Sequence, residues 1–145
     1  MAAPKTKYLK KTVQEVMADA RREIANPSRN WKGLCQGFVR TQYGVQAWAP
    51  SAAAAWAKIP RQHKHIGGTP SQAPRGACLY YVNKSGKGFG HVMIAAGIKT
   101  RNKAIGTDYQ RQGKPDYCPR TIPNWGNLKY VGWSAWTPEG ELHVS

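Results

Sequence analysis

A cysteine, a histidine and an aspartate occupy segments whose predicted elements can bring the three side chains together. Cys35 follows Gly33 and Leu34 at the predicted start of a helix. The amide groups and the dipole at a helix N-terminus stabilise a thiolate, so we expect a lowered pKa for the Cys35 thiol. A thiolate beside a base is the nucleophile of cysteine-dependent acyl transfer, and this is the chemistry that these residue types predict.

The histidine and the aspartate come from two apolar segments, residues 91–96 and 104–108, which a glycine-initiated turn connects. Such a pattern predicts an antiparallel hairpin. A hairpin centred on that turn places His91 opposite Asp108, where Cβ atoms are about 4.5–5.5 Å apart. A carboxylate in this position fixes the imidazole tautomer and stabilises the imidazolium. A shift of one residue in register would turn Asp108 to the other face, and Asp116 is then the alternative acid.

The remaining thiols and histidines offer weaker alternatives for chemistry. Cys78 lies inside an apolar strand, where burial raises the pKa of a thiol, and Cys118 lies in a predicted loop with no helix behind it. The chain has three cysteines without CxxC spacing, so we expect free thiols, although a Cys78–Cys118 bond stays open. His63 and His65 form an H-x-H pair in a loop without a nearby carboxylate, so we predict no metal and no cofactor.

The elements that must position these residues are helices first and strands afterwards. Apolar residues recur at helical spacing in the first part of the chain, and short apolar segments between turns dominate after Gly76. This order is typical of an α+β fold, with N-terminal helices packed on an antiparallel sheet. The expected helices are residues 8–25, residues from Gly33–Cys35 to Tyr43, and residues from a Ser51 cap to before Pro60; the expected strands are residues 77–82, 91–96, 104–108, 130–133 and 142–144.

The length and composition indicate one folded domain over residues 1–145. The chain weighs 16.1 kDa, 41% of its residues are hydrophobic, and six are tryptophans, which is enough apolar surface for a core. No apolar run reaches the roughly 18 residues of a membrane-spanning helix, so we expect no membrane insertion. We also expect a monomer.

The charge points to a polyanionic partner. Lys and Arg number 22 against 7 for Asp and Glu, which gives a formal net charge of +15. The basic residues extend from Lys5 to Lys129 without forming one tail, so they indicate general attraction to nucleic acid, an anionic membrane surface or an acidic wall polymer. No zinc finger, RNP-like motif or concentrated basic helix stripe is present, so we expect no specific nucleic-acid recognition. The start of the chain has no secretory signal, which predicts synthesis in a cytoplasm.

Several segments carry a resemblance to a known family. The first segment, Trp31–Arg40, contains Cys35. A predicted strand pair follows at Pro74–Tyr81 and Gly90–Gly97, and the last segment, Tyr130–Ser134, lies near the end of the chain. These segments resemble the nucleophile helix, the strand pair opened by Gly-His-Val and the closing segment of CHAP-family phage lysins, the cysteine, histidine-dependent amidohydrolase/peptidases. The order of cysteine, histidine and polar residue is also similar in the related NlpC-type peptidases. The resemblance covers roughly residues 8–136.

The resemblance implies a papain-like α+β fold and a peptidoglycan hydrolase that cleaves an amide bond. Cys35 would be the nucleophile, His91 the general base and then acid, and Asp108 the group that orients the imidazole. The backbone N–H of Cys35 would donate to the oxyanion, with Asn30 or Gln36 as the second donor. The resemblance further implies a phage endolysin or virion-associated lysin, made in the host cytoplasm, whose partners are peptidoglycan and the anionic polymers of the bacterial wall.

Two tryptophans could bind substrate in such a cleft. Trp31 is close to Cys35 in sequence, and Trp125 follows Asp108 in a predicted loop, although core packing is the alternative for each. Two other function classes remain: a basic nucleic-acid-binding protein, and an inactive wall-binding or virion module that retains the fold. The intact Cys35, His91 and Asp108 argue against the inactive module. Whether the cleaved bond is that of an amidase or an endopeptidase stays open.

Overall fold

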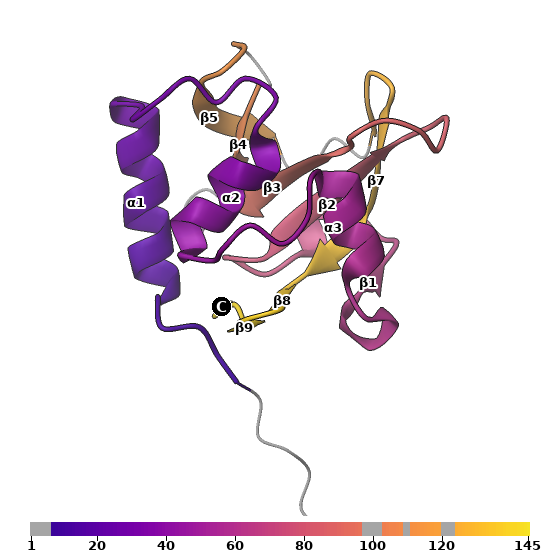
Figure 1. Ribbon diagram of the computed structural model, residues 1–145, viewed down its shortest axis with the longest axis horizontal. Helices are drawn as coiled ribbons and strands as arrows, with labels where there is room; N and C mark the ends of the chain where they lie inside the picture. Colours follow the sequence, from indigo (N-terminus) through magenta and orange to yellow (C-terminus); the bar gives the residue numbers. More distant parts are fainter. Residues whose placement is uncertain (1–6, 97–102, 109–110, 120–123) are drawn as a thin grey trace, which may run out of the picture.

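The computed structural model describes residues 7–96, 103–108, 111–119 and 124–145 (Figure 1). Helices precede the strands, so the predicted α+β organisation is confirmed. The helices in the described part of the chain are α1 (Val13–Ala25), α2 (Cys35–Tyr43) and α3 (Ala52–Lys58), followed by short 3₁₀ turns at Arg61–His63 and Pro70–Gln72.

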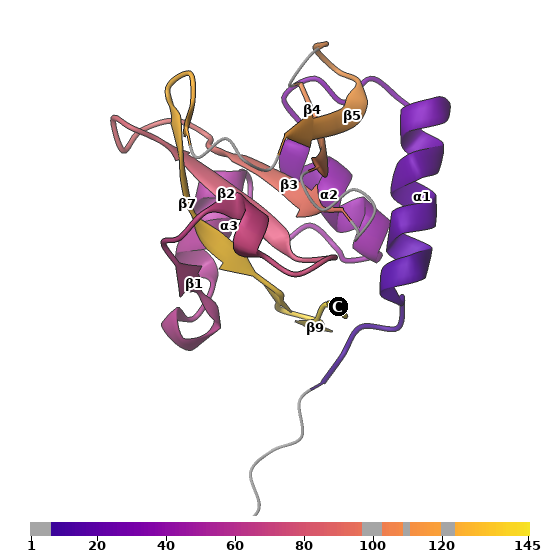
Figure 2. The same ribbon diagram turned by 180° about the vertical axis from the view of Figure 1, so that it is seen from behind.

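Among the described residues, seven strands form one antiparallel sheet, which Figures 1 and 2 show from opposite sides. The strands lie in the order β1-β7-β2-β3-β4-β5, and β6 pairs with β7. The bounds are β1 (His65–Ile66), β2 (Cys78–Asn83), β3 (His91–Ala95), β4 (Lys103–Thr107), β5 (Pro115–Pro119), β6 (Asn124–Trp125) and β7 (Leu128–Ser134). A separate pair consists of β8 (Trp136–Thr137) and β9 (Gly140–Glu141), so the strand predicted at residues 142–144 is wrong.

The first helix begins later than its apolar spacing predicts. The Thr12 side chain accepts a hydrogen bond from the Glu15 backbone N–H, and the Glu15 carboxylate accepts one from the Thr12 backbone N–H. This capping box satisfies N–H groups of the first turn and fixes Val13 as the first helical residue. Tyr8 instead forms a bridge with Glu141 near the C-terminus. The predicted start at residue 8 is therefore wrong.

The two helices around the candidate site begin and end where the sequence predicts. The helix α2 begins at Cys35 and ends at Gly44, whose φ of 76° is a left-handed conformation that glycine adopts without strain. Ser51 caps α3 by accepting a hydrogen bond from the backbone N–H of Ala54. Leu34 precedes α2 without a side-chain acceptor, so the N–H groups of the first turn of α2 remain available.

The strand register that the sequence predicts for the central hairpin is confirmed. Ile94 pairs with Ile105 and Ala95 pairs with Ala104, which is the register that would place His91 opposite Asp108. The connecting turn, at residues 97–102, lies outside the described residues. Cys118 lies in β5 and pairs with Ala104, so its predicted loop position is wrong.

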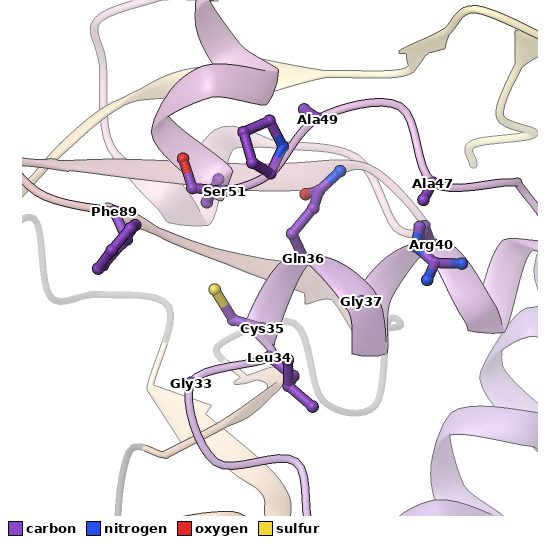
Figure 3. Close-up of a pocket in the computed structure, with 12 residues that line it drawn as sticks. Gly33, Leu34, Cys35, Gln36, Gly37, Arg40, Ala47, Ala49, Ser51 and Phe89 are labelled. Carbon is purple, nitrogen blue, oxygen red and sulfur yellow. The ribbon is translucent and has the colours of Figure 1, made fainter.

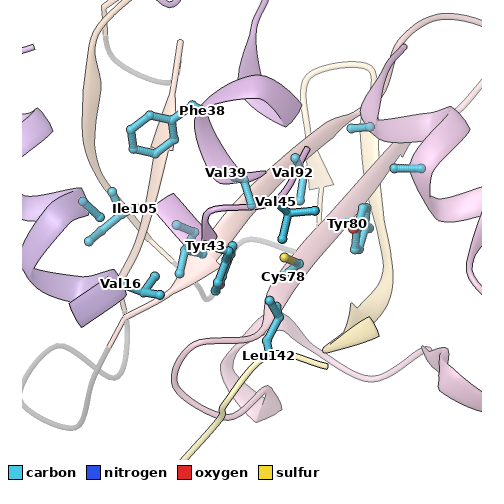
Figure 4. Packing of buried hydrophobic residues seen from close by; sticks show 14 of the residues in the cluster. Val16, Phe38, Val39, Tyr43, Val45, Cys78, Tyr80, Val92, Ile105 and Leu142 are labelled. Carbon is cyan, nitrogen blue, oxygen red and sulfur yellow. The ribbon is translucent and has the colours of Figure 1, made fainter. Parts of the chain in front are cut away.

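Two apolar clusters cover the two faces of the sheet. The larger cluster joins the helices to one face and includes Phe38, Tyr43, Cys78 and Val92 (Figure 4). The smaller cluster lies on the other face. It consists of Ala73, Ala77, Leu79, Tyr81, Met93, Ala95, Ala104 and Cys118. Because Cys78 and Cys118 belong to opposite faces, they cannot form a disulfide without moving the backbone, and all three thiols are free.

Candidate active site

A pocket of about 270 Å³ lies beside the N-terminus of α2 (Figure 3). Cys35 is half-buried and belongs to the wall of this pocket. Two exposed apolar side chains belong to the lining: Phe89 is 79% exposed and Leu34 is 37% exposed. The full lining is Gly33, Leu34, Cys35, Gln36, Gly37, Arg40, Ala47, Ala49, Pro50, Ser51, Ala52 and Phe89.

The Cys35 thiol has a raised pKa, which contradicts the lowered value that its helix position predicts. Burial is the largest cause of the increase, and the negative charge of Asp108 adds to it. The backbone N–H groups of Val92, Gln36 and Cys35 face the sulfur and act in the opposite direction, but they do not outweigh burial. The helix N-terminus therefore contributes as expected, while loss of water around the sulfur has the larger effect.

His91 lies at the start of β3 and is only 5% exposed. Its ring packs edge-to-face on the indole of Trp125, with ring centroids 4.6 Å apart and planes at 89°. Burial lowers the pKa of His91 to about 4, although the nearby Asp108 carboxylate raises it in part. The Nε2 atom of His91 is buried without a hydrogen-bond partner in the described part of the chain. The imidazole is therefore neutral and able to accept a proton.

Gly90 is a position where the backbone beside His91 requires glycine. Its φ is 68°, and a Cβ there would lie 2.6 Å from the Tyr81 carbonyl oxygen and 3.1 Å from the Ala53 nitrogen. The Ala53 N–H donates to the Phe89 carbonyl at 2.9 Å. The loop before β3 is thus held against the start of α3, which fixes both the pocket wall at Phe89 and the strand position of His91.

Asp108 directly follows β4 with a φ of 65°, a left-handed conformation that aspartate tolerates better than most residues. One carboxylate oxygen, Oδ2, accepts from the Gly33 N–H at 3.1 Å, and Oδ1 accepts from the Gly113 N–H at 2.6 Å. The Asp108 carboxylate therefore links the segment that leads into α2 to the segment that contains Gly113. The expected hydrogen bond between Asp108 and the His91 imidazole is not formed, and both oxygens accept from backbone N–H groups instead.

The structure brings the three predicted catalytic residues to one end of the sheet without linking them into a hydrogen-bonded triad. The Cys35 sulfur lies beside the backbone N–H of Val92, the residue that follows His91. Strand side chains alternate, so His91 shares the face of its partner Tyr81, whereas Val92 packs in the cluster beneath α2. The charge of Asp108 acts on the pKa of both Cys35 and His91.

The two predicted substrate-binding tryptophans have different environments. Trp31 is 4% exposed, packs edge-to-face on Phe38 and donates its indole N–H to Glu23 at 3.3 Å. Trp31 is therefore a core residue, and the expectation that it lines the cleft is not supported. Trp125 is half-buried on β6 and contacts His91, but it is not among the residues that line the pocket with Cys35.

The alternative oxyanion donors, Asn30 and Gln36, and the alternative acid, Asp116, lie in different surroundings. The Asn30 side chain is exposed and accepts from the Lys32 backbone N–H at 3.0 Å, outside the pocket lining. Gln36 lines the pocket, so it is the better placed of the two predicted oxyanion donors. Asp116 lies on β5, where one oxygen accepts from the Tyr117 N–H at 2.8 Å. Asp108 is the acid whose charge acts on the pKa of both Cys35 and His91.

The H-x-H pair does not join the pocket. His63 Nδ1 lies 3.1 Å from a Glu141 oxygen, and His65 stacks on Trp133 with ring centroids 3.6 Å apart. Within the described residues, no group of three or more histidine, cysteine, aspartate or glutamate side chains could hold a metal ion.

Arg40 and Phe89 line the pocket, but the sequence analysis did not predict them as site residues. A signal existed for Arg40, because Gln36 and Arg40 are four residues apart and so share one face of the predicted helix. No comparable pattern identified Phe89, whose place in the wall depends on how the loop before β3 folds back on α3.

The fold and the site define an α+β protein with a pocket cysteine at a helix start and a buried histidine on the neighbouring strand. A comparison with protein-family models finds none that matches the chain, and a comparison with curated proteins finds no match either. None of the helices in the described residues is long and apolar enough to span a membrane.

The cysteine environments predict which thiol reacts. In the folded protein at neutral pH, iodoacetamide should modify Cys35, whereas Cys78 and Cys118 should stay protected until unfolding, because burial raises the pKa of each to about 12. Since the pKa of Cys35 is itself raised, its rate should increase about tenfold per pH unit at first. Peptide mapping after short pulses at increasing pH measures both effects. A rate independent of pH from 7 upward would show a thiolate that burial does not suppress.

Proposed function

We propose that this protein is a papain-like cysteine hydrolase that cleaves an amide bond of bacterial peptidoglycan, as a phage endolysin or virion-associated lysin. The observation that carries the proposal is the position of Cys35, half-buried in a pocket wall at the first residue of α2, with its sulfur beside the strand that begins at His91. The resemblance of the surrounding segments to CHAP-family lysins adds the substrate class.

The first chemical stage begins from an uncharged pair. With the pKa of Cys35 raised and that of His91 lowered to about 4, the resting groups are a thiol and a neutral imidazole. As the sulfur attacks the amide carbonyl, the S–C bond forms and the thiol proton passes to His91 as general base. In the structure the imidazole shares the sheet face of Tyr81 and the sulfur lies on the face that α2 covers, so this transfer requires the start of β3 to rearrange when substrate binds.

The oxyanion of the tetrahedral intermediate needs donors beside the sulfur. The backbone N–H groups of Cys35 and Gln36 face the sulfur at the first turn of α2, where helix geometry leaves them without intrahelical acceptors. These two N–H groups supply both oxyanion donors. His91 then protonates the leaving nitrogen as the C–N bond breaks. Water, deprotonated by His91, hydrolyses the thioester, and the thiol returns with its proton.

Asp108 supports this mechanism through different hydrogen bonds than expected. Its bonds to Gly33 and Gly113 hold the segment that sets the start of α2, and therefore the direction of the Cys35 side chain. Its charge also favours the imidazolium that forms during the reaction, because an opposite charge stabilises a protonated histidine. Asp108 is thus a positioning residue.

The net charge suits a wall substrate. Bacterial walls carry phosphate and carboxylate groups, and a net charge of +15 attracts a small enzyme to them. This attraction is screened by salt, so it weakens as ionic strength rises. The protein would be made in the host cytoplasm and would act at the wall.

Digestion of purified peptidoglycan tests the proposed function. We expect the folded protein to release new amine termini, because thioester formation at Cys35 expels the amine side of the cleaved amide. Mass spectrometry of the soluble fragments identifies the bond and distinguishes an amidase from an endopeptidase. The nucleic-acid-binding alternative would be favoured if the protein left walls from several bacterial types undigested and shifted single-stranded nucleic acid on a gel at physiological salt.

A further inference from the structure

The pocket next to Cys35 has a polar floor formed by one face of α2. Gln36 and Arg40 are one helical turn apart, and both line the pocket (Figure 3). The Ser51 hydroxyl already accepts the Ala54 N–H as the cap of α3. The remaining lining is glycine, alanine, proline, leucine and phenylalanine, so the polar side chains beyond Cys35 are Gln36, Arg40 and the Ser51 hydroxyl, which can still donate.

Gln36, which lines this pocket, carries a side-chain acceptor without a hydrogen-bond partner among the described residues. Its side chain is 7% exposed, and its Oε1 atom is buried with no hydrogen-bond partner among the described residues. A buried amide oxygen without a donor is unfavourable, so such an atom in a pocket wall indicates that a ligand supplies the donor. Figure 3 shows the Gln36 amide between Cys35 and the Ala49 segment.

Arg40 places a fixed positive charge at the end of the same floor. Its Nη1 donates to the Val45 carbonyl at 3.3 Å, and Figure 3 shows the guanidinium near Ala47. No carboxylate in the described part of the chain pairs with Arg40. A guanidinium has five N–H donors and binds carboxylates through two parallel hydrogen bonds, so most of its binding capacity remains available.

We propose that Arg40 binds a free carboxylate of the substrate while Gln36 Oε1 accepts an N–H of the same peptide. This inference rests on the proposed function and names its substrate class: a wall peptide with an acidic residue near the cleaved amide. Arg40 follows Cys35 by five residues, or about 7.5 Å along the helix axis. One extended residue spans about 3.3–3.6 Å, so the carboxylate belongs about two residues from the cleaved carbonyl.

Two synthetic wall peptides test the proposal when they differ only in a free carboxylate or a carboxamide at that position. Calorimetry with the Cys35→Ala protein measures binding without turnover, and we expect the acid to bind at least tenfold more tightly than the amide. Arg40→Gln should abolish the preference, and Arg40→Lys should retain part of it. Arg21→Gln is the matched control, because it removes the same charge from an exposed position on α1 and should leave the preference intact.

The outcomes separate the two proposals. Equal binding of acid and amide would overturn carboxylate recognition, even if the wild-type protein cleaves both peptides. A tenfold preference that survives in a folded Arg40→Gln protein would overturn the assignment to Arg40. Selective binding without cleavage by the wild-type protein would support the recognition site and contradict the hydrolase.

Discussion

Replacing Cys35 by alanine is expected to reduce the release of amine termini from peptidoglycan by at least about 1,000-fold, because removal of a covalent nucleophile abolishes the acyl-enzyme route. The change should leave the fold intact, since Cys35 is half-buried in a pocket wall and makes no disulfide. Fragment release per hour, measured by mass spectrometry and compared with wild type, gives the ratio. A thermal melt on the same sample establishes that the variant is folded.

Cys78→Ala and Cys118→Ala are the matched controls for this result. Both sulfurs are buried in apolar clusters on opposite sides of the sheet, so their loss changes packing and leaves the pocket chemistry in place. Each control should keep most of the activity at temperatures where it is folded. Full activity in Cys35→Ala, or a loss as large in a folded Cys78→Ala protein, would contradict the assignment of the nucleophile.

Local sequence rules were sufficient for the parts of the site that depend on neighbouring residues. The start of α2 at Cys35 followed from the change to helical spacing, and its end followed from Gly44. The pairing of Ile94 with Ile105 followed from the position of one turn between two apolar segments. These features are set within a few residues or one hairpin, and the sequence pattern reports them directly.

The electrostatics of Cys35 depended on contacts that the sequence did not reveal. The helix dipole was visible as a short-range feature and predicted a lowered pKa. Burial reverses that direction, and two segments distant in sequence, the one containing Ala49 and the loop ending at Phe89, line the pocket beside Cys35. The direction of the Cys35 pKa shift could therefore be determined only from the tertiary arrangement around the sulfur.

Asp108 and Trp31 show the same limitation for side-chain roles. The hairpin register was right, but the hydrogen bond from Gly33 to Asp108 joins residues 75 positions apart, and no pattern announces it. Trp31 is close to Cys35 in sequence, yet its ring turns toward Phe38 in the core. Proximity in sequence thus identified the region of the pocket but not the side chains that line it.

The burial of His91 has a consequence for stability that can be measured without any substrate. Since burial lowers the pKa of His91 from 6.5 to about 4, the unfolded chain binds a proton between these values while the folded protein does not. The stability that the folded protein has with a neutral His91 is therefore fully present above pH 6.5 and is lost as the pH falls toward 4. Linkage gives a decrease in the free energy of unfolding of about 2 kcal/mol from pH 7 to 5 and about 3 kcal/mol by pH 4.

Urea denaturation at pH 7, 6, 5 and 4 measures this decrease, and His91→Gln should remove most of it. The interval from pH 7 to 5 isolates the histidine, because the carboxyls of Glu15 and Asp19, whose pKa values are lowered, lose their contribution at lower pH. His65→Gln, at an exposed histidine on β1, should keep the decrease. A wild-type protein equally stable at pH 7 and 5 would mean that the imidazole is protonated in place, and the neutral thiol–imidazole pair would have to be replaced by an ion pair.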